Sequence, residues 1–239
     1  MLGADGFSAA QPAITFYSRK YPMNLSPLVI DDLTIPVPII QGGMGIGISL
    51  SGLASAVADA GGVGVIATAG IGWAEEDVKR NYVEANSRAM VKEIKKARQA
   101  TDGVLGVNIM VALSNFPELV AAAAEEGIDI IFSGAGLPLS LPKYLPEGSK
   151  TKLFPIVSSG RATELICRTW KRKFDRLPDA IVVEGPKAGG HIGFKPEQVE
   201  DPAFALEKLI PEVVQAVAKY GEESGKPIPV IAAGGVYSG

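Results

Sequence analysis

Cysteine and histidine are almost absent from the chain, which contains one of each in 239 residues, Cys167 and His191. A single cysteine excludes an intrachain disulfide and a multi-cysteine metal site, and we expect no bound metal. This cysteine usage is typical of the reducing cytoplasm, where we expect the protein to act. Cys167 lies in the helical pattern of Glu164 to Trp170. We expect it to be buried, because a reactive thiolate needs an exposed, electropositive setting.

Positive charge is also scarce. The 23 Lys and Arg residues are outnumbered by 26 Asp and Glu residues, so the formal net charge is -3. No cluster of basic residues lies beside interleaved aromatics, which make up only 7% of the chain. Proteins that bind nucleic acid need a basic surface for the phosphate backbone. We therefore expect no nucleic-acid partner.

The run from Leu33 to Ala58 has no charged residue, but it is not a membrane span. Pro36, Pro38 and five glycines interrupt any continuous helix, which a span would require. The first 22 residues lack the basic start and apolar core of a signal peptide. We expect residues 1–22 to be a loose extension and residues 23–239 to form one domain without membrane contact.

Apolar strand patterns alternate with amphipathic helical patterns along this domain. We expect helices from an N-cap at Ser49 to Ala58, from about Glu75 to Arg98, from Pro117 to Glu126, through Ala162 to Trp170, and from Leu206 to Val217. The predicted strands are Val37–Ile40, Val63–Ala67, Val104–Met110, Asp129–Phe132, Leu153–Val157, the run that starts at Ile181, and Pro229–Ala232.

Seven strand and helix units predict an α/β fold with a parallel sheet and helices outside, either an open doubly wound sheet or a (β/α)8 barrel. No Gly-x-Gly-x-x-Gly follows the first strand, and polar or glycine residues follow many strands rather than one switch point. Both observations favour the TIM barrel, in which all strand-end loops meet at one mouth. Since a barrel needs eight strands, we expect one truncated after strand seven.

The only histidine lies in a glycine-rich loop, Glu184-Gly-Pro-Lys187-Ala-Gly189-Gly190-His191-Ile-Gly193. Adjacent glycines let a backbone approach a flat ligand, and an imidazole exchanges protons near neutral pH. A lone histidine is often only a structural residue, but the end of an α/β strand is where catalytic groups gather. His191 is therefore the candidate catalytic residue.

Four motifs together resemble the nitronate monooxygenase family of FMN-dependent TIM barrels, which is related to flavin-dependent enoyl-acyl-carrier-protein reductases. They are Gln41-Gly-Gly-Met44-Gly, Gly106-Val-Asn108, the His191 loop with its Ala-Gly-Gly-His-x-Gly element, and Pro229-Val-Ile-Ala-Ala-Gly234-Gly235. The resemblance extends from about Pro38 to Gly239.

The resemblance implies FMN as cofactor. It places Gln41, Gly42, Gly43 and Met44 along the flavin, Asn108 and Glu184 at its ring, Gly189 and Gly190 close to it, and Gly234 and Gly235 at its phosphate. From the residues alone, plain turns are the alternative for Gln41–Met44 and Gly234-Gly235, and Ser158-Ser159 could contact the cofactor or cap a helix. The Gly-Thr pair that the family places after strand eight has no counterpart here, so we expect weak FMN retention.

Three functions follow as hypotheses. The first is oxidation of alkyl nitronates or nitroalkanes by O2 to a carbonyl compound and nitrite, with His191 binding the nitro group or removing the α-proton. The second is NAD(P)H-dependent reduction of an enoyl thioester or a quinone through the same flavin. The third is a non-catalytic fragment or a phosphate-ligand-binding barrel. A homodimer is a further expectation.

Overall fold

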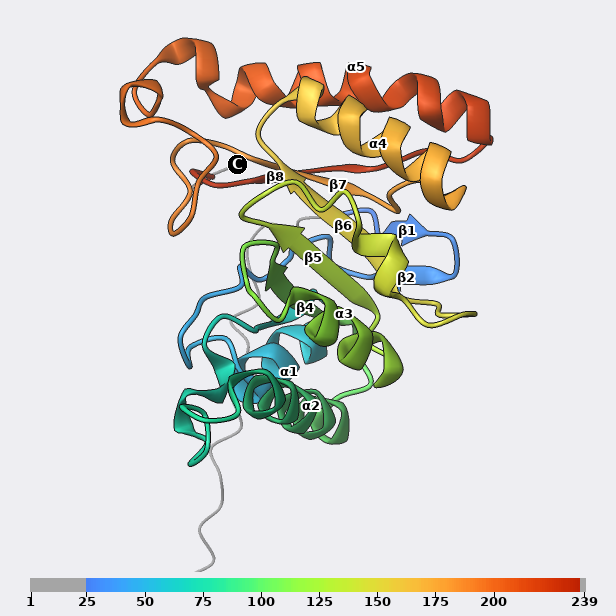
Figure 1. Cartoon of the computed structure of the whole chain (residues 1–239). Coiled ribbons are helices and arrows are strands. Elements are labelled where there is room, and N and C mark those ends of the chain that lie inside the picture. Colours follow the sequence, from blue (N-terminus) through green and yellow to red (C-terminus); the bar gives the residue numbers. More distant parts are fainter. Residues whose placement is uncertain (1–24, 237–239) are drawn as a thin grey trace, which may run out of the picture.

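A six-stranded parallel sheet forms the centre of the computed structural model, which describes residues 25–236 (Figure 1). The extension expected over residues 1–22 lies outside the described residues. The strands follow one another in sequence order across the sheet, as in a barrel and unlike a doubly wound sheet. They are β3 (Gly64–Ala67), β4 (Leu105–Met110), β5 (Ile130–Gly134), β6 (Lys152–Val157), β7 (Ile181–Glu184) and β8 (Val230–Ala233).

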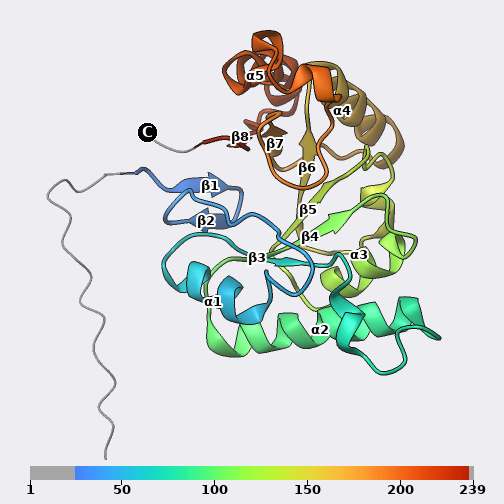
Figure 2. The same cartoon turned by 90° about the vertical axis from the view of Figure 1, so that its left-hand side faces the viewer.

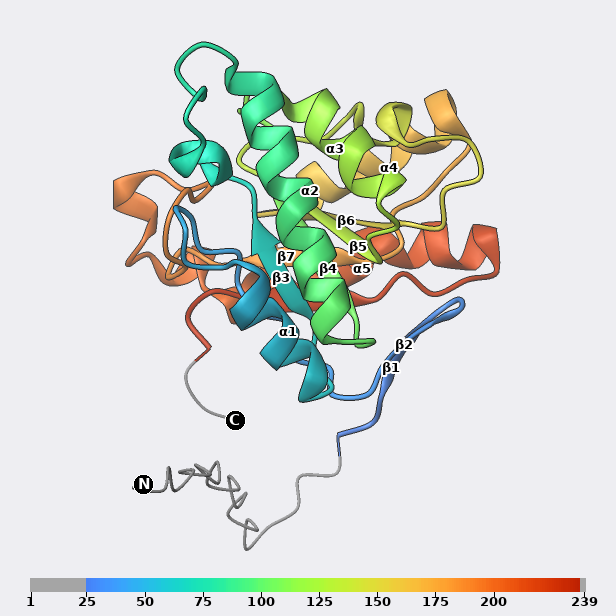
Figure 3. The same ribbon diagram turned by 90° about the horizontal axis from the view of Figure 1, so that it is seen from below.

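Helices cover the convex face of this curled sheet (Figure 2). They are α1 (Ser51–Asp59), α2 (Tyr82–Ala100), α3 (Phe116–Glu125), α4 (Gly160–Phe174) and α5 (Leu206–Ser224). Seen from below, α2, α3 and α4 lie along the outside of the strands (Figure 3). The main core lies between the two layers, where Trp170 is fully buried. Cys167 is buried as predicted, and burial raises the pKa of its thiol to about 12.

Alternate residues of the strands fill the concave face and form a second core. Val65, Phe132, Phe154 and Val182 belong to it, and the rings of Phe132 and Phe154 meet edge to face at 5.3 Å. Side chains rather than a channel therefore occupy the inside of the curl, as in barrel interiors. The prediction of an incomplete TIM barrel is confirmed, with six strands in regular pairing.

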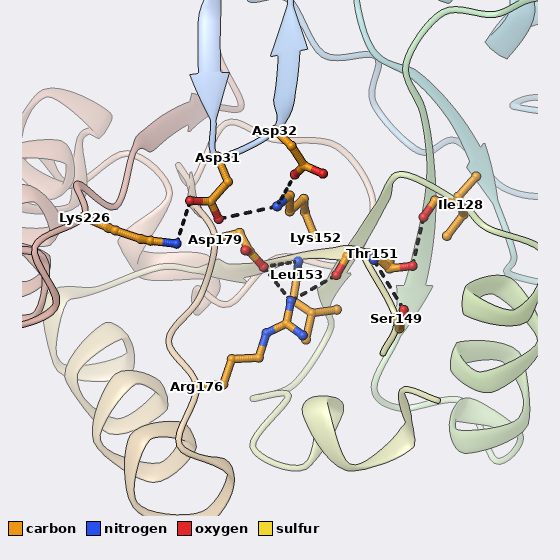
Figure 4. A network of polar contacts seen from close by, with 10 residues as sticks. All are labelled: Asp31, Asp32, Ile128, Ser149, Thr151, Lys152, Leu153, Arg176, Asp179 and Lys226. Atoms are coloured by element: carbon orange, nitrogen blue, oxygen red, sulfur yellow. Dashed lines mark hydrogen bonds and ion pairs between the residues drawn. The ribbon is translucent and has the colours of Figure 1, made fainter. Parts of the chain in front are cut away.

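An antiparallel hairpin closes the end of this second core at which the strands begin. The sequence patterns did not predict this hairpin. Its strands are β1 (Leu28–Ile30) and β2 (Leu33–Ile35), whose Ile30 and Ile35 are buried in the concave cluster. At the hairpin turn Asp31 pairs with Lys226 at 2.8 Å, and Asp32 pairs with Lys152 at 2.8 Å (Figure 4). The hydrogen bond from Lys226 is the main cause that lowers the pKa of Asp31.

The strand predicted over Val37–Ile40 is reduced to a single parallel bridge between Ile40 and Val63. The N–H of Ile39 turns back to the carbonyl of Val37 at 2.6 Å, so a tight turn centred on Pro38 interrupts the extended backbone. The segment still lies beside β3, since Val63 donates to the carbonyl of Ile39 at 2.9 Å. It therefore occupies the place of the first barrel strand.

Two predicted helix starts are wrong. The helix expected from Glu75 begins at Tyr82, because the segment before it forms turns in which Asn81 donates to the carbonyl of Asp77. Ser49 is not an N-cap, since α1 begins at Ser51 and the Ser49 hydroxyl binds the preceding loop. Among the described helices, we find none that combines the length and apolar character needed to cross a bilayer.

Candidate functional site

The residues predicted to bind the cofactor gather at the carboxyl ends of the strands, in two groups. One group joins the Gln41–Met44 loop to β4, and the other joins the loops after β7 and β8. In a parallel barrel this end carries the active site. The hairpin and its ion pairs lie at the opposite end.

Gln41 holds the first loop against β3. Its side-chain amide donates to the carbonyl of Val65 at 2.9 Å and accepts from the N–H of Val65 at 3.3 Å, so it continues the ladder where the backbone stops. The same amide donates to the hydroxyl of Ser49 at 2.9 Å. In the described structure Gln41 thus has a positioning role, and contact with a flavin remains a proposal.

Ser49 was predicted to be a helix N-cap, but its side chain belongs to the candidate site. The fully buried hydroxyl accepts from the N–H of Met44 at 3.0 Å and donates to the carbonyl of Gly42 at 3.2 Å. These bonds fix the glycine loop from inside. A serine eight residues after Gln41, at the end of a glycine-rich turn, was the available signal.

Gly43 lies directly against Asn108 of β4. This contact joins the Gln41–Met44 loop to β4. A β-carbon at Gly43 would lie 2.5 Å from the Cβ of Asn108, so only glycine fits there. Asn108 alternates with the buried Val107 and Ile109, which places its half-buried side chain on the concave side of β4. An amide at the top of the concave face can hydrogen-bond a ligand in the mouth.

Glu184 ends β7 on the same concave side, since it alternates with Val183 of the outer core and follows Val182 of the inner one. Burial raises the pKa of its carboxyl, and no hydrogen bond or opposing charge contributes to the shift. Burial makes the protonated form of this carboxyl, which can donate a hydrogen bond, easier to reach than in an exposed glutamate.

The loops after β7 and β8 are packed on each other. A β-carbon at Gly234 would lie 2.6 Å from the Cβ of Ala188, and one at Gly235 would lie 2.9 Å from the Cβ of Lys187. Both glycines have positive φ, 83° and 81°. Within residues 25–236 neither N–H group has a backbone acceptor, so both can bind an anion.

His191 is exposed on the β7 loop, which also carries the exposed Gly189 and Gly190. The loop crosses the end of β6, because a β-carbon at Gly193 would lie 2.8 Å from the hydroxyl oxygen of Ser158. Next to it, Ser159 caps α4 by accepting from the N–H of Ala162 at 3.2 Å. The imidazole thus projects from a loop anchored at β6 and β8, where a bound substrate can reach it.

A cavity of about 550 Å³ opens beside Gly234 and Gly235 and extends to the start of α5. Its size is within the range of cofactor pockets. Lys187 is the cation among its lining residues, and Glu200, Asp201 and Glu207 are the anions. An anionic group fits only the glycine and Lys187 side of this cavity. Within the described chain, no cluster of three or more potential metal ligands occurs.

Replacing Glu184 with glutamine is expected to stabilise the protein near pH 7 and to change nothing near pH 4. A raised pKa in the folded state means that ionisation opposes folding, so the native chain loses stability as the pH rises from the ordinary pKa of 4.5 through the folded value. The gain at pH 7 over that at pH 4 measures how far the pKa is raised, because one pKa unit corresponds to roughly 1.4 kcal/mol. Urea unfolding at pH 4, 5.5 and 7 measures it.

The control for this measurement is Glu223→Gln, which removes an exposed carboxyl on α5. It should leave the pH profile of stability unchanged. Equal profiles for Glu184→Gln and the native chain would show that the Glu184 carboxyl is solvated in solution.

Comparison with known proteins identifies the fold and the family. The model of the nitronate monooxygenase family matches residues 26–239. FabK of Thermotoga maritima superposes with a TM-score of 0.61 at 31% identity, over 84% of this chain and 52% of that one.

Two curated relatives are enzymes with different names. A (3aS,4S,5R,7aS)-5-hydroxy-7a-methyl-1-oxo-octahydro-1H-indene-4-carboxyl-CoA dehydrogenase of Mycobacterium tuberculosis is 28% identical, over 91% of this chain and 50% of its own length. A nitronate monooxygenase of Pseudomonas aeruginosa is 29% identical, over 87% of this chain and 61% of its own length.

The chain therefore spans about half to three fifths of the length of these relatives. Its matched segment includes the glycine loop at Gln41, the His191 loop and Gly234-Gly235. The chain belongs to the nitronate monooxygenase family of flavin-dependent oxidoreductases.

Proposed function

We propose that the chain forms the FMN-binding and proton-transferring part of an oxidoreductase that converts alkyl nitronates and O2 to a carbonyl compound and nitrite. The observation that carries this proposal is the packing of the His191 loop on Gly234-Gly235. It joins in one unit an exposed imidazole and two backbone N–H groups that have no backbone acceptor within residues 25–236. Such a unit suits a phosphate-bearing cofactor with a small anionic substrate beside it.

The residues present fit FMN. Gly234 and Gly235 offer N–H groups and Lys187 offers a cation for the phosphate, in the place where barrels bind phosphate. Gly43 and Asn108 on one side and Glu184 on the other would flank the ring. Bound flavin would supply the redox chemistry, and the protein would supply orientation and proton transfer.

His191 would act on the substrate. With a nitronate, its N–H would hydrogen-bond the anionic nitro oxygens. With a neutral nitroalkane, its free nitrogen would remove the α-proton, as a general base does. Glu184 would face the bound ring at the top of the concave face, where burial makes its charged form less favourable than in water.

A second candidate is reduction of an enoyl thioester, with NAD(P)H as electron donor. The name of the Mycobacterium tuberculosis relative, a carboxyl-CoA dehydrogenase, favours this alternative. His191 would then hydrogen-bond the thioester carbonyl. The same loop geometry serves both reactions.

Flavin titration followed by two activity assays tests the proposal. The chain is titrated with FMN and flavin fluorescence is followed. Oxygen uptake is then measured with ethyl nitronate, and NAD(P)H oxidation is measured with crotonyl-CoA. Oxygen uptake with nitrite release supports the proposal, NAD(P)H oxidation with the thioester supports the second candidate, and no FMN binding contradicts both.

A matched pair of glycine variants locates the phosphate. Gly234→Ala should weaken FMN binding, because φ is positive and Ala188 blocks the new methyl group. Gly225→Ala carries a similar positive φ of 69° at the end of α5, with free space around it. It controls for backbone strain and should bind FMN like the native chain.

A further inference from the structure

The hairpin β1–β2 covers one end of the concave core without joining the large sheet. Among the described strands, β1 and β2 pair only with each other, and each has three residues. An isolated hairpin is marginally stable at best in water. Contacts between its side chains and the rest of the molecule must therefore keep it in place.

These contacts are of two kinds. Ile30 and Ile35 are buried in the concave cluster, whereas Val29 and Thr34 on the other face of the hairpin are exposed. The second kind is a cluster of charges at the hairpin turn, seen in Figure 4. We call it the charge clasp and define it as Asp31, Asp32, Lys152 and Lys226.

Lys152 is the centre of the charge clasp. Its ammonium group lies 2.8 Å from the carboxylate of Asp32 and 3.4 Å from that of Asp31, and its side chain is only 11% exposed. Lys226 pairs with Asp31 from the outside, with a side chain that is 69% exposed. An exposed pair contributes little to stability, but a nearly buried cation is costly without its anions. The clasp therefore depends mainly on Lys152.

The sheet side of the clasp is held rigidly. Next to Lys152, the N–H of Leu153 donates to the Asp179 carboxylate at 2.8 Å. Asp179 also pairs with Arg176 at 2.8 Å, and Arg176 donates to the carbonyl of Thr151 at 3.0 Å (Figure 4). Both neighbours of Lys152 are thus fixed by hydrogen bonds. If the clasp opens, the hairpin moves and the sheet stays.

The turn itself does not favour the two carboxylates. Asp31 has a φ of 52°, in the left-handed region that glycine and asparagine adopt most readily. Asparagine and glycine are also the preferred residues of two-residue hairpin turns, and the adjacent charges of Asp31 and Asp32 repel each other. These two residues suit a hairpin that is docked on Lys152 and Lys226, and they weaken an undocked one.

We propose that the charge clasp is a releasable lock on the hairpin. When its charges are neutralised or screened, β1 and β2 leave the end of the curl as one unit, and the six-stranded sheet with its helices stays folded. Segments with few contacts open locally in this way. Release uncovers the part of the concave core that contains Phe154 and Val182. The clasp lies at the end opposite the candidate site, so the proposal is independent of the proposed function.

Hydrogen–deuterium exchange followed by mass spectrometry tests the lock on the whole chain. The double variant Asp31→Asn/Asp32→Asn should exchange at least about fivefold faster than the native chain over residues 25–36, because Lys152 loses its anions. The segment of β4, Leu105–Met110, should exchange at the native rate. Asparagine keeps the size of aspartate and favours the turn, so an effect of the turn alone would slow exchange. Unchanged or slower exchange of the hairpin, or equal acceleration of both segments, would overturn the proposal.

A second route to the open state is Lys152→Met, which keeps an apolar stem and removes the cation. It should also accelerate exchange over residues 25–36. Combining it with the two asparagine substitutions should bring the rate back toward that of the native chain, because no unpaired charge remains. Accelerations that multiply in the triple variant would show that the charges act separately and would contradict the clasp.

The control is Asp175→Asn, which breaks the pair of Lys171 with Asp175 at the end of α4, outside the clasp. It should leave exchange of the hairpin unchanged. Salt provides a test without substitution. Raising it from about 0.05 M to about 0.5 M should accelerate hairpin exchange in the native chain more than in the triple variant, because screening acts on charges. Equal salt dependence in the two proteins would count against the lock.

Discussion

Replacing His191 with alanine is expected to lower the turnover of a neutral nitroalkane by about 10²–10⁴-fold, the usual contribution of a general base. The fold and FMN binding should persist, because His191 is exposed and its loop is anchored by Gly193, Gly234 and Gly235 instead. Steady-state oxygen uptake with nitroethane measures turnover. Flavin fluorescence and urea unfolding measure the two properties that should persist.

A preformed nitronate separates the two roles of His191, since its α-proton is already gone. With ethyl nitronate the alanine variant should lose much less activity than with nitroethane. His191→Gln is the matched variant, because it keeps a hydrogen-bond donor without the basicity of imidazole. It should restore nitronate turnover and leave nitroalkane turnover low. Equal losses on both substrates would exclude the base role.

Periodicity predicted most of the fold because each barrel unit is local in sequence. Each of the six regular strands was found within a few residues of its observed bounds, and the stripe on α4 indeed buries Ile166 and Trp170. The hairpin β1–β2 was missed, since three-residue strands carry too little alternation to be recognised. A strand was predicted over Val37–Ile40 because these residues are mostly apolar, but the tight turn between Val37 and Ile39 leaves a single bridge at Ile40.

The candidate site was predicted less completely than the fold. Glycine motifs at strand ends indicated which segments meet, and the contact of Gly43 with Asn108 and that of Gly234 with Ala188 bring their segments together. The tasks of individual polar groups were not predictable. Whether Gln41 faces a ligand or completes a ladder depends on the length of the neighbouring strand, and Ser49 binds a turn whose path no local pattern specifies. Such contacts depend on three-dimensional positions.

The packing of α1 on β3 leads to the second large expected effect, on stability. A β-carbon at Gly64 would lie 1.8 Å from the carbonyl oxygen of Ala54 and 2.6 Å from its carbonyl carbon. Both atoms belong to the backbone of α1, so no side-chain rotation can relieve the clash, and the helix must shift. Gly64→Ala should therefore lower the free energy of unfolding by at least about 3 kcal/mol, the upper end of the overpacking range. Urea unfolding measures the loss.

Gly52→Ala is the control, because it adds the same methyl group to α1 itself. Nothing lies within 4 Å of a β-carbon at Gly52, and alanine is the better helix former, so stability should rise by about 0.5 kcal/mol. Opposite signs of the two stability changes would show that the loss in Gly64→Ala comes from the close approach of Gly64 to Ala54. A general sensitivity of α1 to substitution would instead destabilise both variants. The shift of α1 in Gly64→Ala should also move Ser49, two residues before the helix, and weaken FMN binding in proportion. A Gly64→Ala protein as stable as the native chain would show that α1 does not pack on β3 at this distance.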